Sequence, residues 1–267
     1  MTPTLWHIPI SHYSEKARWT LDFKGVEHRR HAPRPPVHMA VALALTRGAQ
    51  KTFPVLRIDG RNVGDSTAII AALEESYPKP ALYPAGPAER ARALELEDIF
   101  DEELGPHIRL LAWHELTRDP DALRDLVAGD LPRRVRGSAR ARAGAARLAT
   151  AFVGTRYGVK SSERAELARE KVVVALDRLE FELGEGEYLV GERFSVADLT
   201  AAALFYPLVL PPEGPRLGAR PPAFERFRES LGDRRGYRWV AGIYRRHRRR
   251  AWFDTGLRAH GAVGPLI

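Results

Sequence analysis

Residues 7–19, HIPISHYSEKARW, join an extended segment to a helix near the start of the chain. The segment at 4–8 is aliphatic and aromatic and predicts a strand, whereas the apolar residues after Ser14 recur at helical spacing. Ser11 lies where the two meet. A helix N-terminus presents unpaired N–H groups and partial positive charge, so Ser11 either caps the helix or also holds its hydroxyl against an anionic ligand atom.

The first eighty residues continue this alternation of short strands and helices. We expect strands at 4–8, 27–32, 54–58 and 61–63, and helices at 14–24, 36–46 and 66–77. A right-handed crossover makes the first two strands parallel, and the short turn at Asp59-Gly60 makes the last two antiparallel. The sequence therefore predicts an α/β domain with a mixed four-stranded sheet and helices on its faces.

Four prolines in residues 77–87, YPKPALYPAGP, interrupt this pattern. We expect a first domain at 1–79, a Pro-rich linker at 80–87 and an all-α domain at 88–267. The predicted helices of the second domain are 88–118, with a kink at Gly105-Pro106, then 162–183, 196–206, 222–231 and 236–250. An Ala/Arg-rich insertion at about 119–160 separates the first two, and we interpret it as an exposed amphipathic helix.

Composition limits the chemistry. At 267 residues and 44% hydrophobic, the chain can bury a proper core, and it contains no cysteine, so any reacting thiol must come from a ligand. There is no apolar run of membrane-spanning length and no secretory signal pattern, so we expect a cytoplasmic protein. The net charge of +8 is concentrated near the C-terminus, and we interpret YRRHRRR, residues 244–250, as a solvated helix face. No nucleic-acid motif accompanies it, so no nucleic-acid partner is expected.

Three motifs occur in order on the matching elements: SHYSEKARW at 11–19, KTFPVL at 51–56 and GDSTAI at 64–69. Further along, YLVGERFSVADLTAAALF at 188–205 contains a Ser-x-x-Asp capping box, which we interpret as structural. Together these segments resemble the cytosolic glutathione S-transferase family, in its bacterial, serine-type form. The resemblance implies a thioredoxin-like N-terminal domain, a helical-bundle C-terminal domain, a homodimer and a function in detoxification.

The resemblance implies that Ser11 is the catalytic hydroxyl, which donates a hydrogen bond to the glutathione thiolate. Such a bond stabilises the thiolate over the thiol, so serine need not act as a nucleophile. Tyr13 and Ser14 are the alternatives. A phenol is a better acid than an alcohol, so Tyr13 remains a candidate for the contact with the thiol. Ser14 is expected to face the helix interior.

Five further residues are predicted to bind glutathione: Lys51, Phe53, Pro54, Asp65 and Ser66. The resemblance implies that Pro54 is cis and that the Phe53 backbone pairs with the extended ligand as an added strand. Lys51 is placed to neutralise a ligand carboxylate. We expect Ser66 to cap the helix at 66–77 and to hold a carboxylate there, with Asp65 accepting from an α-amino group. The alternative for Asp65 and Ser66 is a pure capping pair.

The electrophile site is the least defined part. His107, Arg109 and Trp113 follow the predicted kink and are candidates to face the cleft between the domains, with core packing as the alternative. The histidines of the first domain show no metal-ligand spacing, so no metal is expected.

The leading interpretation is an enzyme that transfers the thiol of glutathione, or of a related low-molecular-weight thiol, to a small hydrophobic electrophile. The Arg-, Ala- and Gly-rich composition is typical of high-GC bacteria, some of which use other thiols. The alternative is a non-catalytic interaction protein of the same fold, which uses its basic C-terminal tail or the insertion. The sequence does not identify the electrophile.

Overall fold

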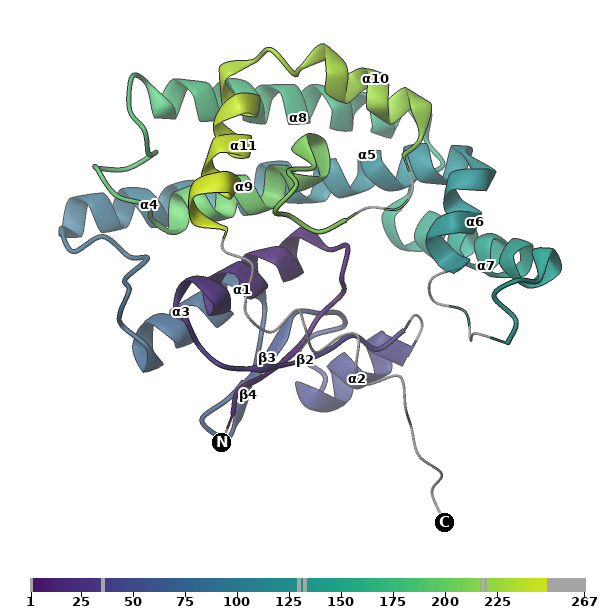
Figure 1. The fold of residues 1–267 in the computed structure, drawn as a ribbon, viewed down its shortest axis with the longest axis horizontal. Helices are drawn as coiled ribbons and strands as arrows, with labels where there is room; N and C mark the ends of the chain where they lie inside the picture. Colours follow the sequence, from purple (N-terminus) through teal and green to yellow (C-terminus); the bar gives the residue numbers. More distant parts are fainter. Residues whose placement is uncertain are drawn as a thin grey trace.

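A computed structural model describes residues 2–34, 37–128, 131, 134–216, 218 and 220–248 of the chain. A small sheet with its helices forms one layer, and a helical bundle lies against it (Figure 1). The elements of the first part are β1 (Thr4–Trp6), α1 (His12–Phe23), β2 (Arg29–His31), α2 (Val37–Leu45), β3 (Val55–Ile58), β4 (Arg61–Gly64) and α3 (Ser66–Ser76). The elements of the second part are α4 (Pro87–Ile99), the π-helical turn η1 (Phe100–Leu104), α5 (Gly105–Arg118), α6 (Pro120–Ala128), α7 (Ala139–Tyr157), α8 (Ser162–Leu183), α9 (Val196–Val209), α10 (Pro222–Ser230) and α11 (Arg235–His247).

The sheet has the strand order β2-β1-β3-β4. β1 pairs parallel with β2, and β3 pairs antiparallel with both β1 and β4, so the predicted mixed sheet is confirmed. Leu5 and Leu56, which are register partners, pack with the apolar faces of α1 and α3. Because side chains alternate along a strand, the neighbouring Trp6 and Val55 point the other way and pack with α2. The first domain is therefore a thioredoxin-like sheet covered on both faces.

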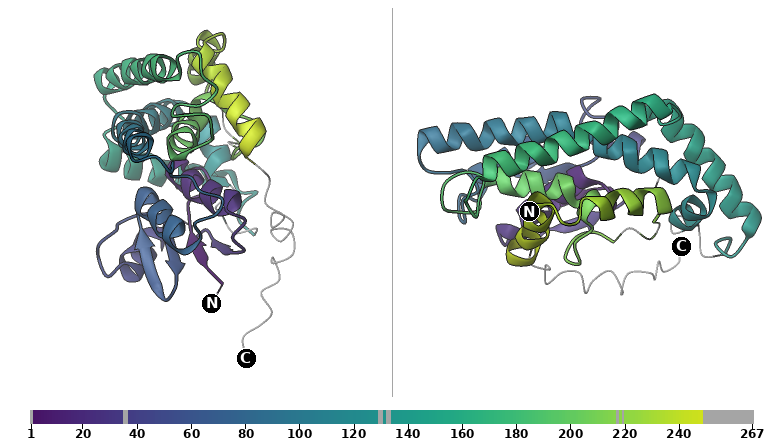
Figure 2. Two further views of the ribbon diagram at one scale, coloured as in Figure 1. Left: turned by 90° about the vertical axis from the view of Figure 1, so that its left-hand side faces the viewer. Right: turned by 90° about the horizontal axis from the view of Figure 1, so that it is seen from above.

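α1 lies between the sheet and the helical domain (Figure 1; Figure 2, left). Its Ala17 and Leu21 belong to the core over the sheet, whereas Trp19 packs against Tyr244 of α11 with ring centroids 4.4 Å apart. α9, which is buried along its whole length, covers the same helix. The Ser195–Asp198 capping box that begins α9 is present: the Ser195 N–H donates to Asp198 Oδ2 at 2.8 Å.

The predicted kink at Gly105-Pro106 appears one turn earlier, as the π-helical turn η1 between α4 and α5. In this turn the Gly105 N–H donates to the carbonyl of Phe100, five residues back. The next donor in that register would be residue 106, but proline has no N–H. The carbonyl of Asp101 is therefore left without a helical donor, and this carbonyl is used by the site described below.

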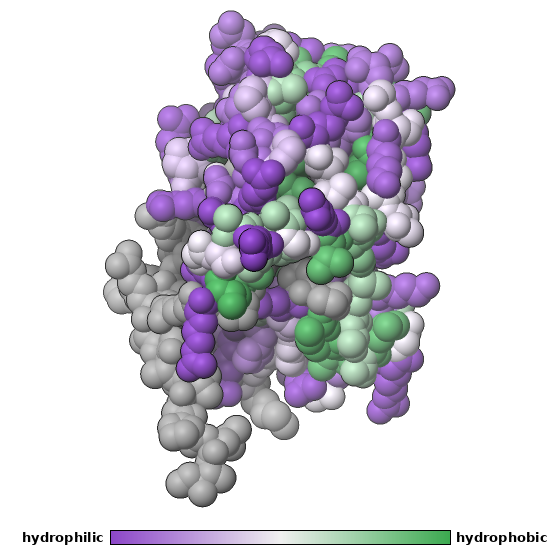
Figure 3. All heavy atoms as spheres, turned by 90° about the vertical axis from the view of Figure 1, so that its right-hand side faces the viewer, coloured by the Kyte–Doolittle hydropathy of each residue, from purple (hydrophilic) through white to green (hydrophobic). Residues whose placement is uncertain are grey.

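The Ala/Arg-rich insertion is not one solvated helix, as predicted, but two helices that pack on each other, α6 and α7. α7 begins at its cap Ser138, and its Ala146 and Val153 are buried. The Phe152 ring meets His38 of α2 edge-on, with centroids 6.4 Å apart. Figure 3 views the molecule from the side that lies on the right in Figure 1. Hydrophilic side chains dominate the upper part of this face, whereas hydrophobic side chains gather lower down. Only the outer face of α7 is solvated, because its other face is packed against neighbouring helices.

The basic run at the end of the described chain is also not simply a solvated face. Arg245 and Arg246 are exposed as predicted, but Tyr244 is fully buried. His247 stacks on Phe194 with ring centroids 4.2 Å apart. Arg248 is buried in ion pairs. The residues at 249 and 250 lie outside the described residues.

Candidate functional site

A cleft with a cavity volume of about 660 Å³ opens between the two domains. It lies between the N-terminus of α1, the loop before β3 and the start of α3 on one side, and α5, α7 and α9 on the other. Eight residues predicted from the sequence line it: Ser11, Tyr13, Phe53, Pro54, Asp65, Ser66, Arg109 and Trp113. The other three candidates, Ser14, Lys51 and His107, are not part of the lining.

Ser11 is the N-cap of α1 and lies half-buried in the cleft wall. Its Oγ accepts a hydrogen bond from the Ser14 N–H at 3.2 Å. This bond uses a lone pair of the hydroxyl oxygen, so the O–H proton stays available for a ligand. Capping and donation to a ligand are therefore compatible at Ser11. Ser14 is fully buried, and its Oγ accepts from the Ile8 N–H at 3.1 Å, which fixes the chain entering the helix.

Tyr13, the other candidate hydroxyl, is engaged in a bond across the domains. Its O–H donates to the carbonyl of Asp101 at 3.0 Å, the carbonyl freed by Pro106. A side chain at Gly105 would overlap the Tyr13 hydroxyl, so glycine is required for this approach. Burial raises the pKa of Tyr13 well above its usual value. A phenol that donates to a backbone carbonyl and resists ionisation is a poorer thiol activator than the hydroxyl of Ser11.

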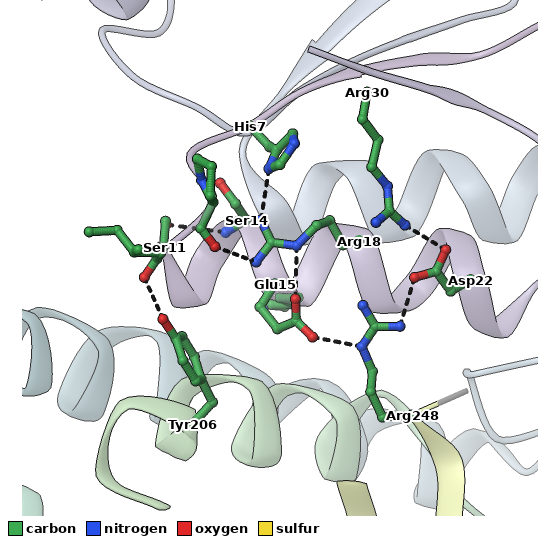
Figure 4. A network of polar contacts seen from close by, with 12 residues as sticks. His7, Ser11, Ser14, Glu15, Arg18, Asp22, Arg30, Tyr206 and Arg248 are labelled. Atoms are coloured by element: carbon green, nitrogen blue, oxygen red, sulfur yellow. Dashed lines mark hydrogen bonds and ion pairs between the residues drawn. The ribbon is translucent and has the colours of Figure 1, made fainter. Parts of the chain in front are cut away.

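The segment before Ser11 is held from two directions. Arg18 of α1 donates to the carbonyls of Ile8 at 3.2 Å and Pro9 at 3.1 Å (Figure 4). Tyr206 of α9 donates to the carbonyl of Ile10 at 2.7 Å (Figure 4). Three consecutive carbonyls are thus bonded by side chains from both domains, which fixes where the hydroxyl of Ser11 enters the cleft.

The start of α3 differs from the prediction in its cap. Asp65, not Ser66, is the N-cap, and its Oδ1 accepts from the N–H groups of Thr67 at 2.9 Å and Ala68 at 3.2 Å. The prediction was wrong because the helix already includes Ser66 as its first residue, so the preceding side chain reaches the free N–H groups. Asp65 has φ +76°, a strained value for a non-glycine residue, at the cleft wall. The N–H of Ser66 has no acceptor within the helix, and Ser66 lines the cleft.

The Phe53–Pro54 peptide bond is cis, as the resemblance implies. Both residues are buried and line the cleft beside Ser66. Lys51 is exposed and outside the lining, and the neighbouring Gln50 lines the cleft instead. Gln50 packs on Gly64 of β4, where there is no room for a side chain.

A buried ion cluster beneath the cleft was not predicted from the sequence. The ammonium of Lys16 is fully buried and lies 2.7 Å from Glu97 Oε1 and 2.6 Å from Asp101 Oδ2. Thr67 accepts from the same ammonium at 2.8 Å and donates to Asp101 at 2.8 Å. The cluster joins α1, α3, α4 and η1. The sequence offers little signal for this cluster, because Lys16 lies among the charged residues Glu15, Arg18 and Asp22 of the same helix.

On the far wall, Arg109 of α5 lies over two aromatic rings, 5.7 Å from the centroid of Tyr13 and 4.7 Å from that of Tyr157. Trp113 follows one turn later and shares the cleft. His107 lies outside the lining because two residues along a helix rotate a side chain by roughly 200°. Tyr157 and its neighbour Arg156 come from α7, and nothing in the Ala/Arg-rich segment indicated that its last turn reaches the cleft.

His12 also lines the cleft. Its side chain is buried, and burial together with the positive charge of Arg109 lowers its pKa to about 3. The imidazole is therefore neutral near neutral pH. Among the described residues, no group of three or more His, Asp or Glu side chains is arranged to hold a metal ion. In the same described part of the chain, no helix is long and apolar enough to cross a membrane.

Family models match both parts of the chain. Residues 5–81 match the glutathione S-transferase N-terminal domain, and residues 143–234 match the glutathione S-transferase C-terminal domain. The two matches together cover more than half of the chain, in the order of its two domains. The chain belongs to the glutathione S-transferase family.

The chain is also similar in sequence to individual curated proteins. Maleylacetoacetate isomerase of Dictyostelium discoideum is 27% identical over 160 residues, 58% of this chain and 55% of that protein. Probable maleylacetoacetate isomerase 1 of Drosophila melanogaster is 43% identical over 53 residues, 20% of this chain and 22% of that protein. The chain thus spans about half, or less, of the length of these curated relatives.

Solved structures share the fold at low identity. The β-etherase LigF from Sphingobium sp. strain SYK-6 superposes with a TM-score of 0.59 at 22% identity, covering 90% of this chain and 98% of that one. FzlA from C. crescentus gives a TM-score of 0.57 at 22% identity, covering 90% and 92%. At these identities the similarity shows the two-domain fold alone.

Proposed function

We propose that this chain is a serine-type glutathione transferase, which activates the thiol of glutathione for attack on a small electrophilic molecule. The observation that carries the proposal is the pair of hydroxyls at the start of α1. Ser11 keeps its proton available at the cleft, whereas Tyr13 donates its proton to Asp101. Family membership supports the choice of ligand, and the absence of cysteine requires that the reacting thiol comes from outside the chain.

The first domain supplies the binding groups for glutathione. In the described part of the chain, no hydrogen bond occupies the backbone N–H or carbonyl of Phe53, so both remain for an extended peptide ligand. Ser66 offers its hydroxyl and its N–H at the positive end of α3 for the γ-glutamyl carboxylate. Asp65 has a second carboxylate oxygen for the α-amino group. Lys51 is exposed beside this site and remains a candidate for the glycyl carboxylate only.

The chemistry follows from the position of Ser11. Its O–H donates to the ligand sulfur, and the N-terminus of α1 adds partial positive charge, so both favour the thiolate over the thiol. The thiolate sulfur then forms a bond to the electrophilic carbon. The leaving group departs with the bonding electron pair, or a double bond takes up a proton. Ser11 therefore acts by stabilising an anion, and no covalent intermediate with the protein is required.

Glutathione binding is tested by thermal unfolding and calorimetry. A ligand that binds only the folded state raises the melting temperature, so glutathione is compared with other low-molecular-weight thiols in one panel. Ser66→Ala is expected to weaken glutathione binding by about 1–3 kcal/mol, the size of a lost hydrogen bond to a charged group. The control is Ser76→Ala at the other end of α3, which lies outside the cleft lining. Equal affinity of Ser66→Ala and the parent would remove Ser66 from the binding site, and no response to any thiol would overturn the proposal.

We also propose a cytoplasmic homodimer, the assembly typical of the family. In such a dimer the first domain of one subunit packs against the helical domain of the other. Light scattering at micromolar concentration is expected to give twice the 29.9 kDa of the chain. A single species of 29.9 kDa would contradict the dimer. The alternative of a non-catalytic interaction protein loses part of its basis, because Tyr244, His247 and Arg248 of the basic run are used inside the fold.

A further inference from the structure

We infer that the electrophilic substrate carries a carboxylate that pairs with Arg109. This inference rests on the proposed function and adds the chemical class of the second substrate. It starts from an arginine in the cleft that has aromatic neighbours but no acidic partner.

Arg109 has no ion-pair partner within 4.0 Å among the described residues, and its Nε is buried without a hydrogen-bond partner there. Its contacts are the faces of Tyr13 and Tyr157. A second cation lies near the same ring: the guanidinium of Arg156 is 5.7 Å from the Tyr157 centroid. Arg156 has no carboxylate partner in the described chain either. Two like charges around one tyrosine, without a counter-ion, favour binding of an anion between them.

The described cleft lining also contains acidic residues, none of which pairs with Arg109. Asp98 and Glu102 line it from α4 and η1, and Asp101 is already paired with Lys16. Glu102 and Arg109 are seven residues apart, about two helical turns, so roughly 10 Å of helix separates their backbones. Asp65 adds a carboxylate from the first-domain wall, and these acidic groups suit the ammonium of glutathione. Arg109 is then left for the second substrate.

The surroundings of Arg109 also indicate the body of this substrate. Ala112, Trp113 and Leu116 of α5 and Pro207 of α9 line the same wall. An apolar surface next to a cation that is stacked on rings fits a flat apolar or aromatic body with a carboxylate at its edge. Arginine binds a carboxylate with two parallel hydrogen bonds, which orients such a body as well as holding it.

The test compares two glutathione conjugates of the same shape in calorimetry, S-(4-carboxybenzyl)glutathione and S-(4-carbamoylbenzyl)glutathione. Both fill the two halves of the cleft without any reaction, and only the first carries the additional negative charge. For the parent protein we expect the carboxylate conjugate to bind at least tenfold more tightly than the amide. This preference should shrink as salt is added.

Variants identify the residue responsible. Arg109→Gln should weaken the carboxylate conjugate by about 10- to 100-fold and the amide conjugate by less than threefold, whereas Arg109→Lys should retain part of the preference. The matched control is Arg147→Gln, an exposed arginine on α7 outside the cleft lining, which should change neither affinity.

Several outcomes overturn the inference. Equal affinity of the parent protein for the carboxylate and the amide conjugate would overturn it without any variant. An equal loss of affinity for both conjugates in Arg109→Gln would also overturn it. If Arg109→Gln weakens glutathione itself as much as the carboxylate conjugate, the arginine binds the tripeptide and not the second substrate. If neither conjugate nor glutathione binds the parent, the proposed function itself fails. In the other outcomes glutathione still binds, and only the inference about Arg109 fails.

Discussion

The carboxylate of Glu15 and the guanidinium of Arg248 meet at 2.6 Å, although they are 233 positions apart in the chain (Figure 4). Arg248 also pairs with Asp22 at 2.7 Å, and Glu15 pairs with Arg18 at 2.8 Å. Burial opposes the ionisation of Glu15, but Arg248 and Arg18 outweigh it and hold its pKa below the usual value. The last described residue is therefore joined to α1, the helix that presents Ser11.

This ion pair predicts a large effect of a distant substitution. Arg248→Gln leaves Glu15 buried with one cation fewer, and breaking a buried pair by removing one partner costs about 3–5 kcal/mol. The free energy of unfolding, measured by urea denaturation, should fall by that order. Arg245→Gln on the exposed side of α11 is the control and should stay within about 0.5 kcal/mol of the parent. A similar, small effect of both substitutions would show that the pair contributes little.

The second prediction concerns the hydroxyl that contacts the thiol. Ser11→Ala should move the titration of bound glutathione, followed by thiolate ultraviolet absorbance, to higher pH, and should lower turnover by one to a few orders of magnitude, about 1.4 kcal/mol for each tenfold. Tyr13→Phe should leave the titration in place because its proton is already donated to Asp101. Ser14→Ala should act on stability, since its Oγ holds the Ile8 N–H.

Two results would contradict the assignment of the thiol contact to Ser11. If Ser11→Ala costs about 1 kcal/mol of stability and leaves the bound thiol unchanged, Ser11 is a helix cap only. If the titration moves with Tyr13→Phe instead, the phenol and not the alcohol contacts the sulfur.

The third prediction couples Gly105 to Tyr13. A methyl group at Gly105 would overlap the Tyr13 hydroxyl, so Gly105→Ala should destabilise the protein by about 1–3 kcal/mol through overpacking. Removing the hydroxyl relieves the closest part of the overlap, although the ring carbon Cζ would still lie 2.7 Å from the added methyl group. Gly105→Ala should therefore cost less in the Tyr13→Phe background than in the parent, but should not become neutral. A double-mutant cycle of unfolding free energies measures this difference. Additive effects would mean that the two residues do not share the contact.

The fourth prediction is a pH dependence of stability. The pKa of His12 is about 3 in the folded chain, against 6.5 for an exposed histidine, because burial and the positive charge of Arg109 disfavour the charged form. Below pH 6.5 the unfolded chain therefore binds a proton that the folded chain does not, so the free energy of unfolding falls as the pH is lowered. From pH 7 to pH 5 this single group accounts for about 2 kcal/mol.

Denaturation curves at several pH values check this expectation. His12→Asn should reduce the slope of the profile between pH 7 and pH 5 without removing it, because burial also lowers the pKa of His7, to about 2. His31→Asn, at an exposed strand position, should preserve the slope. An unchanged slope in His12→Asn would assign the acid sensitivity to other groups.

The sequence by itself determined the parts of this protein that depend on near neighbours. Periodicity located the strands and most helices, because the face that each segment buries repeats every two or 3.6 residues. The N-cap position of Ser11 and the capping box at Ser195 and Asp198 also follow from hydrogen bonds that span three residues. These local signals were enough for the family resemblance and for most of the first-domain wall of the cleft.

Only the tertiary structure decided which groups remain free to act. Tyr13 is engaged because Pro106, far along the chain, frees the carbonyl of Asp101, and nothing near Tyr13 in the sequence indicates this. Arg248 turns inward because Glu15 and Asp22 are buried and need a cation. Such pairings depend on which distant charges are desolvated together, and a charge shows no partner in a linear sequence until folding has excluded the water around it.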